Sequence, residues 1–134
     1  MNLAVERRLL QAAVMIACLV PLTIGGLSVV FGPSIITRGL DAGANLDSHF
    51  RYLSGIFLAL GIAFASCVPA IEARGARFRL LGAMVVAGGL ARLLSLGVVG
   101  WPGVGHQLGL VMELVVVPLL MLWQRRVARH AARA

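Results

Sequence analysis

The chain has 134 residues, of which 60% are hydrophobic and 13% are charged, and its formal net charge is +7. Soluble domains usually carry about 25% charged and about 45–50% apolar residues, and a globule of this length buries only about two-thirds of its unfolded surface. The composition therefore argues against a soluble enzyme, a disordered tail and a DNA-binding module, and it favours the lipid bilayer as the solvent.

Four apolar runs follow one another, each close to the ~20 residues that a transmembrane helix needs. They predict an all-α fold, a four-helix transmembrane bundle, with helices at about 9–31, 52–71, 78–100 and 106–123 in one membrane domain over residues 1–134. The polar stretch after the first run leaves room for a short surface helix, and Asp47 or Ser48 is the expected N-cap of the second span. Trp101-Pro102-Gly103 has the composition of a tight turn, and Pro118 lies inside the fourth run.

The arginines indicate the orientation of the spans. Positively charged residues concentrate on the cytoplasmic side of membrane proteins, and nine of the twelve arginines lie at alternate helix ends: Arg7, Arg8, Arg74, Arg77, Arg79, Arg125, Arg126, Arg129 and Arg133. We therefore expect a multi-pass membrane protein with both termini cytoplasmic, and with Arg38 and Arg51 on the outer side. Membrane lipids are the expected partners of this surface. Nucleic acid is not expected, since no aromatic or folded nucleic-acid reader accompanies the arginines.

Arg92 and Glu113 are the charged residues that lie deepest within the predicted spans. Each costs about 2.5–3.5 kcal/mol at a helix centre on insertion scales. Arg92 is eleven residues before Gly103 and Glu113 is ten residues after it. Antiparallel neighbouring helices joined at that turn would place the two side chains at the same depth, so we expect an ion pair, which the planar guanidinium can make with two hydrogen bonds.

Two interpretations of this pair remain open. It is either a structural clip that holds the last hairpin together or the floor of a site for a polar-headed ligand or a proton. The residues expected at the rim of such a pocket, all in the outer half of the bundle, are Arg51, Ser54, His49, His106 and Thr23. No cluster has metal-ligand spacing and no cofactor fingerprint occurs, so we expect neither a metal nor a cofactor.

Three segments of the chain resemble a known family. They are Arg51-Tyr52-Leu53-Ser54-Gly55, the run from Gly89 to Leu96 with Gly100-Trp101-Pro102, and Glu113-Leu114 leading to Trp123-Gln124-Arg125-Arg126. Together they resemble the bacterial membrane family named domain of unknown function 4345. The resemblance implies four helices, a location in the bacterial inner (cell) membrane and motif positions at Arg51, Arg92 and Glu113, but no activity. The chain departs from it at Val99, where an acidic residue is expected.

These features predict a small integral membrane protein with a binding or accessory role. A polar pocket in the outer half would hold a small amphiphile or a helix of a partner membrane protein. One alternative is a membrane-embedded enzyme for a lipid-soluble substrate, in which Glu113 is the general acid/base and Arg92 tunes it or binds an anion. Another is a small transporter, dimeric because four helices rarely enclose a path alone. Catalysis usually needs more than one pair of titratable groups, so the binding role is preferred over the enzyme, and a homodimer is compatible with it.

Overall fold

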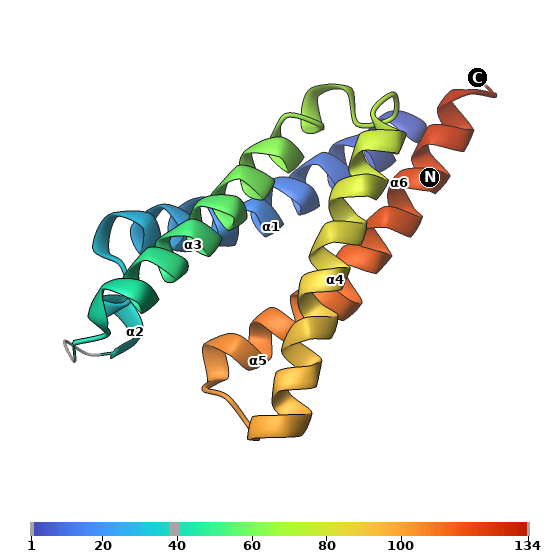
Figure 1. The fold of residues 1–134 in the computed structure, drawn as a ribbon. Coiled ribbons are helices and arrows are strands. Elements are labelled where there is room, and N and C mark those ends of the chain that lie inside the picture. The colour runs from blue at the N-terminus through green and yellow to red at the C-terminus, as the bar shows by residue number, and fades with distance from the viewer. Residues whose placement is uncertain (1, 38–40, 134) are drawn as a thin grey trace. The chain divides into compact units, whose positions relative to one another are not determined.

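The computed structural model describes residues 2–37 and 41–133, and every regular element in them is helical (Figure 1). Because the long runs of Leu, Val, Ile and Ala carry few helix breakers, helix is the conformation that satisfies their backbone groups in lipid. The prediction of an all-α fold is confirmed. The elements are α1 (Leu3–Phe31), α2 (Ser34–Thr37), α3 (Gly43–Ala65), the 3₁₀ turn η1 (Val68–Ala70), α4 (Gly75–Val99), α5 (Val104–Val111), the π-helical turn η2 (Met112–Val116) and α6 (Val117–Ala131).

Four helical segments in the described part of the chain are long and apolar enough to cross a membrane, which confirms the predicted number of spans. They are Leu3–Phe31, Gly43–Ala70, Gly75–Val99 and Val104–Ala131, with mean hydropathies of 2.3, 2.0, 1.8 and 1.7. At most 22% of each apolar window is buried inside the protein. Side chains that are this apolar and this exposed need lipid around them.

All four spans are longer than the apolar runs predicted, the third of them by only two residues. The first begins at Leu3, the second at Gly43, and the last continues to Ala131. The polar residues in these extensions do not end the helices, because several of them pair with one another within the fold. The expected surface helix between the first two spans is present as α2. Arg38, expected on the outer side, lies outside the described residues.

The predicted N-cap at Asp47 or Ser48 is wrong. Both residues lie inside α3, which begins four residues before Asp47. At the start of α3, Asp41 Oδ1 accepts a hydrogen bond from the backbone N–H of Gly43, the first residue of the helix, at 2.9 Å. Asp47 instead pairs with Arg51 one turn later, at 2.8 Å between Oδ2 and Nε, a spacing that favours ion pairs on a helix surface.

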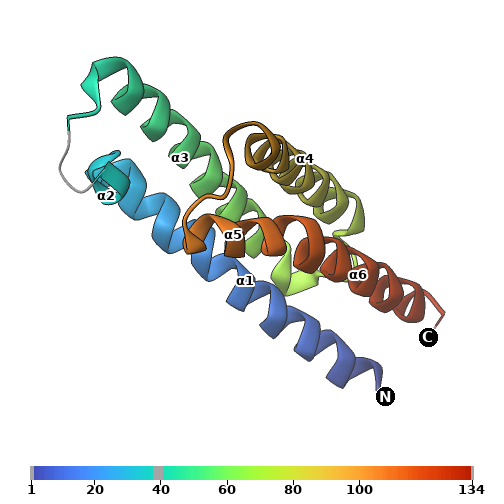
Figure 2. The ribbon, with the colours of Figure 1, turned by 90° about the horizontal axis from the view of Figure 1, so that it is seen from below.

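The chain forms two compact units, one made of Met1–Gln11 and Pro69–Ala134 and the other of Ala12–Val68. In the second unit α1 and α3 lie side by side (Figures 1 and 2). A Cβ placed on Gly25 would be 3.0 Å from the backbone nitrogen of Leu58, and one on Gly61 would be 3.0 Å from the ring of Pro21. Small residues at these crossings let the two backbones approach, as in other membrane helix pairs.

The first unit is built on the last two spans. After α4 ends, the non-helical residues 100–103 reverse the chain, as the composition of this segment predicted. Gln107 closes the turn by donating from Nε2 to the carbonyl of Pro102 at 2.8 Å. α4 then packs against α5, η2 and α6 (Figures 1 and 2). Near the other end of this hairpin, Gln124 is fully buried and donates to the carbonyl of Ile71 at 2.8 Å.

Candidate functional site

Three side chains meet in the half of the hairpin nearest the turn at residues 100–103. Arg92 Nε donates to Glu113 Oε2 and Arg92 Nη2 donates to Glu113 Oε1, both at 3.0 Å. Arg92 Nη1 lies 2.7 Å from Nδ1 of His106. The side chain of Glu113 is 13% exposed and that of Arg92 is 34% exposed. We call Arg92, Glu113 and His106 the outer cluster.

The contact between Arg92 and His106 has one possible direction as a hydrogen bond. A guanidinium has donors and no acceptor, so Arg92 Nη1 donates and Nδ1 of His106 accepts. Within the outer cluster one guanidinium balances one carboxylate.

Glu113 is held by an irregular turn of the last span. It is the second residue of the π-helical turn η2, in which the N–H of Val117 bonds to the carbonyl of Met112, five residues back. Pro118 follows directly at the start of α6. Proline has no N–H for the carbonyl four residues before it, and its ring clashes with that carbonyl. The wider turn relieves this conflict, and such turns are frequent at functional sites.

Gly89 on α4 permits the close approach at Glu113. A Cβ at this position would be 2.8 Å from Cβ of Glu113 and 2.8 Å from Cδ2 of Leu114. Its neighbour Gly88 faces open space, with nothing within 4 Å of the corresponding Cβ position. Gly89 therefore sets the spacing between α4 and η2, and Gly88 does not.

The other residues expected at the pocket rim belong to the unit Ala12–Val68. Arg51 binds Asp47 and also donates from Nη1 to the carbonyls of Val29 and Val30 at 2.6 and 2.8 Å. Those carbonyls lie in the last turn of α1, where helix C-termini leave acceptors without intrahelical donors and attract cations. Gly32, with φ +63°, follows the helix end, and a Cβ there would be 2.6 Å from Arg51 Nη2. Arg51 thus caps α1.

The hydroxyl groups expected at the rim are used within their own helices. Ser54 is buried and donates to the carbonyl of Phe50 at 2.7 Å, and Thr23 donates to that of Leu19 at 2.6 Å. His49 is exposed on α3. The structure thus brings His106 to Arg92 and Glu113, and a pocket rim formed by the other four residues stays a prediction.

An open cavity of about 420 Å³ lies in the unit Ala12–Val68, where α1 ends and α3 begins. Phe31, Pro33, Ser34, residues 41–44 and Asp47 line it. None of the rim residues predicted from the sequence is among these lining residues. In the described residues no group of three or more His, Cys, Asp or Glu side chains could hold a metal ion.

The comparison with protein families supports the resemblance found in the three sequence segments. The model of the family Domain of unknown function (DUF4345) matches residues 9–124. The chain belongs to the DUF4345 family. No curated protein and no solved structure is significantly similar to it. The matched segment of this DUF4345 protein contains the whole outer cluster and Arg51.

A second charged cluster of the DUF4345 protein was not predicted from the sequence. Glu6 is 2% exposed, although it lies in the first turn of α1. Its carboxylate oxygens lie 2.9 Å from Nε of Arg126 and 3.6 Å from Nδ1 of His130, both on α6. Beside it, Arg7 Nε lies 3.1 Å from Oε2 of Glu72. We call these five residues the inner cluster.

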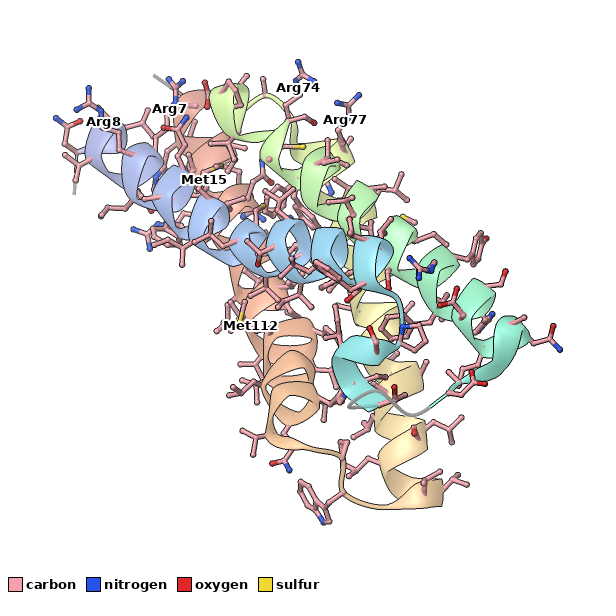
Figure 3. All side chains as sticks on the ribbon, turned by 90° about the vertical axis from the view of Figure 1, so that its left-hand side faces the viewer. Arg7, Arg8, Met15, Arg74, Arg77 and Met112 are labelled. Carbon is pink, nitrogen blue, oxygen red and sulfur yellow. The ribbon has the colours of Figure 1, made fainter. Side chains whose placement is uncertain are left out.

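Further arginines lie at the same end of this unit as Arg7. Figure 3 shows Arg8, Arg74 and Arg77 there together with Arg7. The sequence could have suggested that Glu6 pairs with an arginine far along the chain, because the span ends on this side carry many arginines. The burial of Glu6 could not be predicted, since it depends on how the end of α6 packs.

Proposed function

We propose that this DUF4345 protein is an integral protein of the bacterial inner membrane that binds a small amphiphile through the outer cluster. Four helices apolar enough to cross a membrane make it a membrane protein by composition and length. The concentration of nine arginines at alternate helix ends supports cytoplasmic termini. With that orientation the turn at residues 100–103 faces outward, and the outer cluster lies in the outer half of the hairpin.

The exposure of Arg92 is the observation that carries the proposal. Glu113 is 13% exposed and Arg92 is 34% exposed, so part of the guanidinium stays accessible to a ligand. Three of the five guanidinium N–H groups are used, two by Glu113 and one by His106. The two remaining N–H groups, on Nη1 and Nη2, are donors for a ligand head group. Apolar surface with a few fixed polar groups is what ligand sites offer.

The geometry favours binding over the alternative of a membrane-embedded enzyme. A general acid/base must exchange a proton with its substrate within hydrogen-bond reach. Both oxygens of Glu113 accept hydrogen bonds from Arg92, so a substrate would have to displace one of these bonds to reach the carboxylate. A dimeric transporter requires an interface between two copies, whereas binding through the outer cluster needs only α4, α5 and η2 of one chain.

Native mass spectrometry of the protein released from lipid nanodiscs tests the proposal. The double variant Arg92→Leu with Glu113→Leu removes both charges together, so no unpaired charge is left inside the membrane. We expect the wild-type protein to retain a small amphiphile that the double variant has lost. The matched control is Arg7→Leu with Glu72→Leu, which removes an equivalent pair from the inner cluster and should retain the amphiphile. Equal retention by the two double variants would refute the proposal.

A further inference from the structure

The end of the first unit that lies opposite the outer cluster holds the whole formal net charge of the protein. Nine arginines and two carboxylates, Glu6 and Glu72, lie near the start of α1, around the start of α4, and in and just after the second half of α6. Their excess of seven positive charges equals the formal net charge of +7 of the chain. The other three arginines and three carboxylates, elsewhere in the chain, cancel one another.

Both carboxylates at this end are already occupied. Glu6 pairs with Arg126 at 2.9 Å and Glu72 pairs with Arg7 at 3.1 Å. Among the described residues, none of the seven other arginines forms an ion pair with an acidic side chain, and all seven are exposed. They are Arg8, Arg74, Arg77, Arg79, Arg125, Arg129 and Arg133. We call these seven residues the arginine surface, and Figure 3 shows three of them, Arg8, Arg74 and Arg77.

The placement of these arginines is unfavourable for the protein by itself. Arg125 and Arg129 are four residues apart on α6, a spacing at which like charges repel each other. Arg74 and Arg77 lie at the N-cap and in the first turn of α4, where the helix dipole disfavours cations. In the described structure that first turn holds no acidic residue, and no side chain caps it. Anions from outside the chain would relieve both effects.

The contacts beside the arginine surface hold it in a fixed arrangement. Arg7 Nη2 donates to the carbonyl of Pro69 at 3.1 Å, and the fully buried Gln124 donates to that of Ile71 at 2.8 Å. Together with the ion pair of Glu6, these bonds join the start of α1, the connection before α4 and the end of α6. A surface that is ordered before it binds loses less conformational freedom on binding.

The part of the arginine surface on α6 lies where lipid head groups are expected. Trp123 ends the apolar part of the last span, and tryptophan is typical of the membrane–water interface. Beyond it α6 continues to Ala131, with Gln124 and Val127 buried and the arginines exposed. Clusters of about four to eight basic residues directly after a transmembrane helix are typical of sites for anionic lipids. Residues 125–133 contain four arginines.

We propose that the arginine surface binds the phosphodiester head groups of anionic lipids of the phosphatidylglycerol type and discriminates against zwitterionic lipids. A guanidinium can donate two parallel hydrogen bonds to one phosphate. A zwitterionic head group brings its own cation close to the arginines, whereas an anionic one does not. This surface is at the opposite end of the hairpin from the outer cluster, so the inference goes beyond the proposed function and is independent of it.

Native mass spectrometry of the protein in a nonionic detergent tests the inference. The probes are dioleoylphosphatidylglycerol and dioleoylphosphatidylcholine, which have the same acyl chains and are titrated separately. We expect the first phosphatidylglycerol to bind at least about fivefold more tightly than the first phosphatidylcholine, a ratio that corresponds to about 1 kcal/mol, the contribution of one basic residue near anionic lipid. Equal affinities would overturn the inference and leave an acidic segment of a partner protein as the occupant of this surface.

A soluble competitor separates a lipid from a free phosphate compound as the source of the head group. Glycerol 3-phosphate carries the phosphate without acyl chains. At a concentration equal to that of phosphatidylglycerol it should leave lipid binding unchanged, because only the lipid is held in the micelle beside the arginines. Displacement of the lipid by this compound would overturn the assignment to lipid.

Two triple variants locate the preference on the protein. The combination of Arg125→Gln, Arg129→Gln and Arg133→Gln leaves the inner cluster intact and should bring the two lipid affinities together. The matched control lowers the net charge by the same amount in the other unit, through Ala44→Glu, Asn45→Asp and Ser48→Glu at exposed positions of α3, and should keep the preference. Helical circular dichroism checks that both variants fold. A preference that survives in the glutamine variant, or that is lost in the control, would overturn the inference.

Discussion

The ion pair between Glu6 and Arg126 should respond very differently to the loss of one partner or the other. The side chain of Glu6 is 3% exposed and that of Arg126 is 63% exposed. Arg126→Gln leaves a carboxylate buried without its main partner, a change that costs about 3–5 kcal/mol in other proteins. Glu6→Gln leaves an arginine that is already mostly in water, so the loss should resemble that of a surface ion pair, about 0–1 kcal/mol.

The difference of roughly 3 kcal/mol corresponds to about a hundredfold difference in the unfolding equilibrium constant. It can be measured by equilibrium unfolding in mixed micelles of sodium dodecyl sulfate, followed by helical circular dichroism. Arg125→Gln is the matched control, because it removes an exposed arginine from the adjacent position on α6, and it should leave stability nearly unchanged. If Glu6→Gln destabilises the protein as much as Arg126→Gln, burial does not control the energetics of this pair.

Three further results are expected. Arg92→Leu should destabilise the protein by about 3–5 kcal/mol in the same unfolding assay, because Glu113 is left unpaired, and the double variant with Glu113→Leu should recover much of that loss; additive effects of the two changes would argue against the coupling. Gly89→Ala should cost about 1–3 kcal/mol through overpacking against Glu113, whereas Gly88→Ala should be nearly neutral, and equal effects in thermal unfolding would contradict the crossing described above. A reporter enzyme fused after Ala134 should be active in the cytoplasm, and a periplasmic signal would reverse the orientation.

The number of spans and the contact between Arg92 and Glu113 could be predicted from the sequence for simple physical reasons. Apolar runs of membrane length fold as helices because lipid offers the backbone no other partner. Two residues almost equidistant from a turn reach the same depth in an antiparallel hairpin. Neither argument needs knowledge of side-chain packing.

Features that depend on packing or on polar extensions could not be predicted in this way. The sequence does not show that the guanidinium of Arg51 reaches the carbonyl oxygens at the end of α1. The sequence predicts a start of α3 that is too late, because Asp47 has the composition of a cap and is in fact the i, i+4 partner of Arg51 inside the helix. The burial of Glu6 is not visible in the sequence either, because residues at a span end are usually exposed.

The π-helical turn has a consequence for how the last span can vary. Each residue of an α-helix turns the chain by about 100°, so one additional residue in a single turn offsets everything that follows by about that angle. Leu120, Gln124 and Val127, the buried positions of α6, therefore lie on a stripe that is set separately from the direction of Glu113. Insertion or deletion of one residue within η2 would redirect the carboxylate while α6 kept its packing. A single such event could create or remove the charged pair without rebuilding the rest of the hairpin.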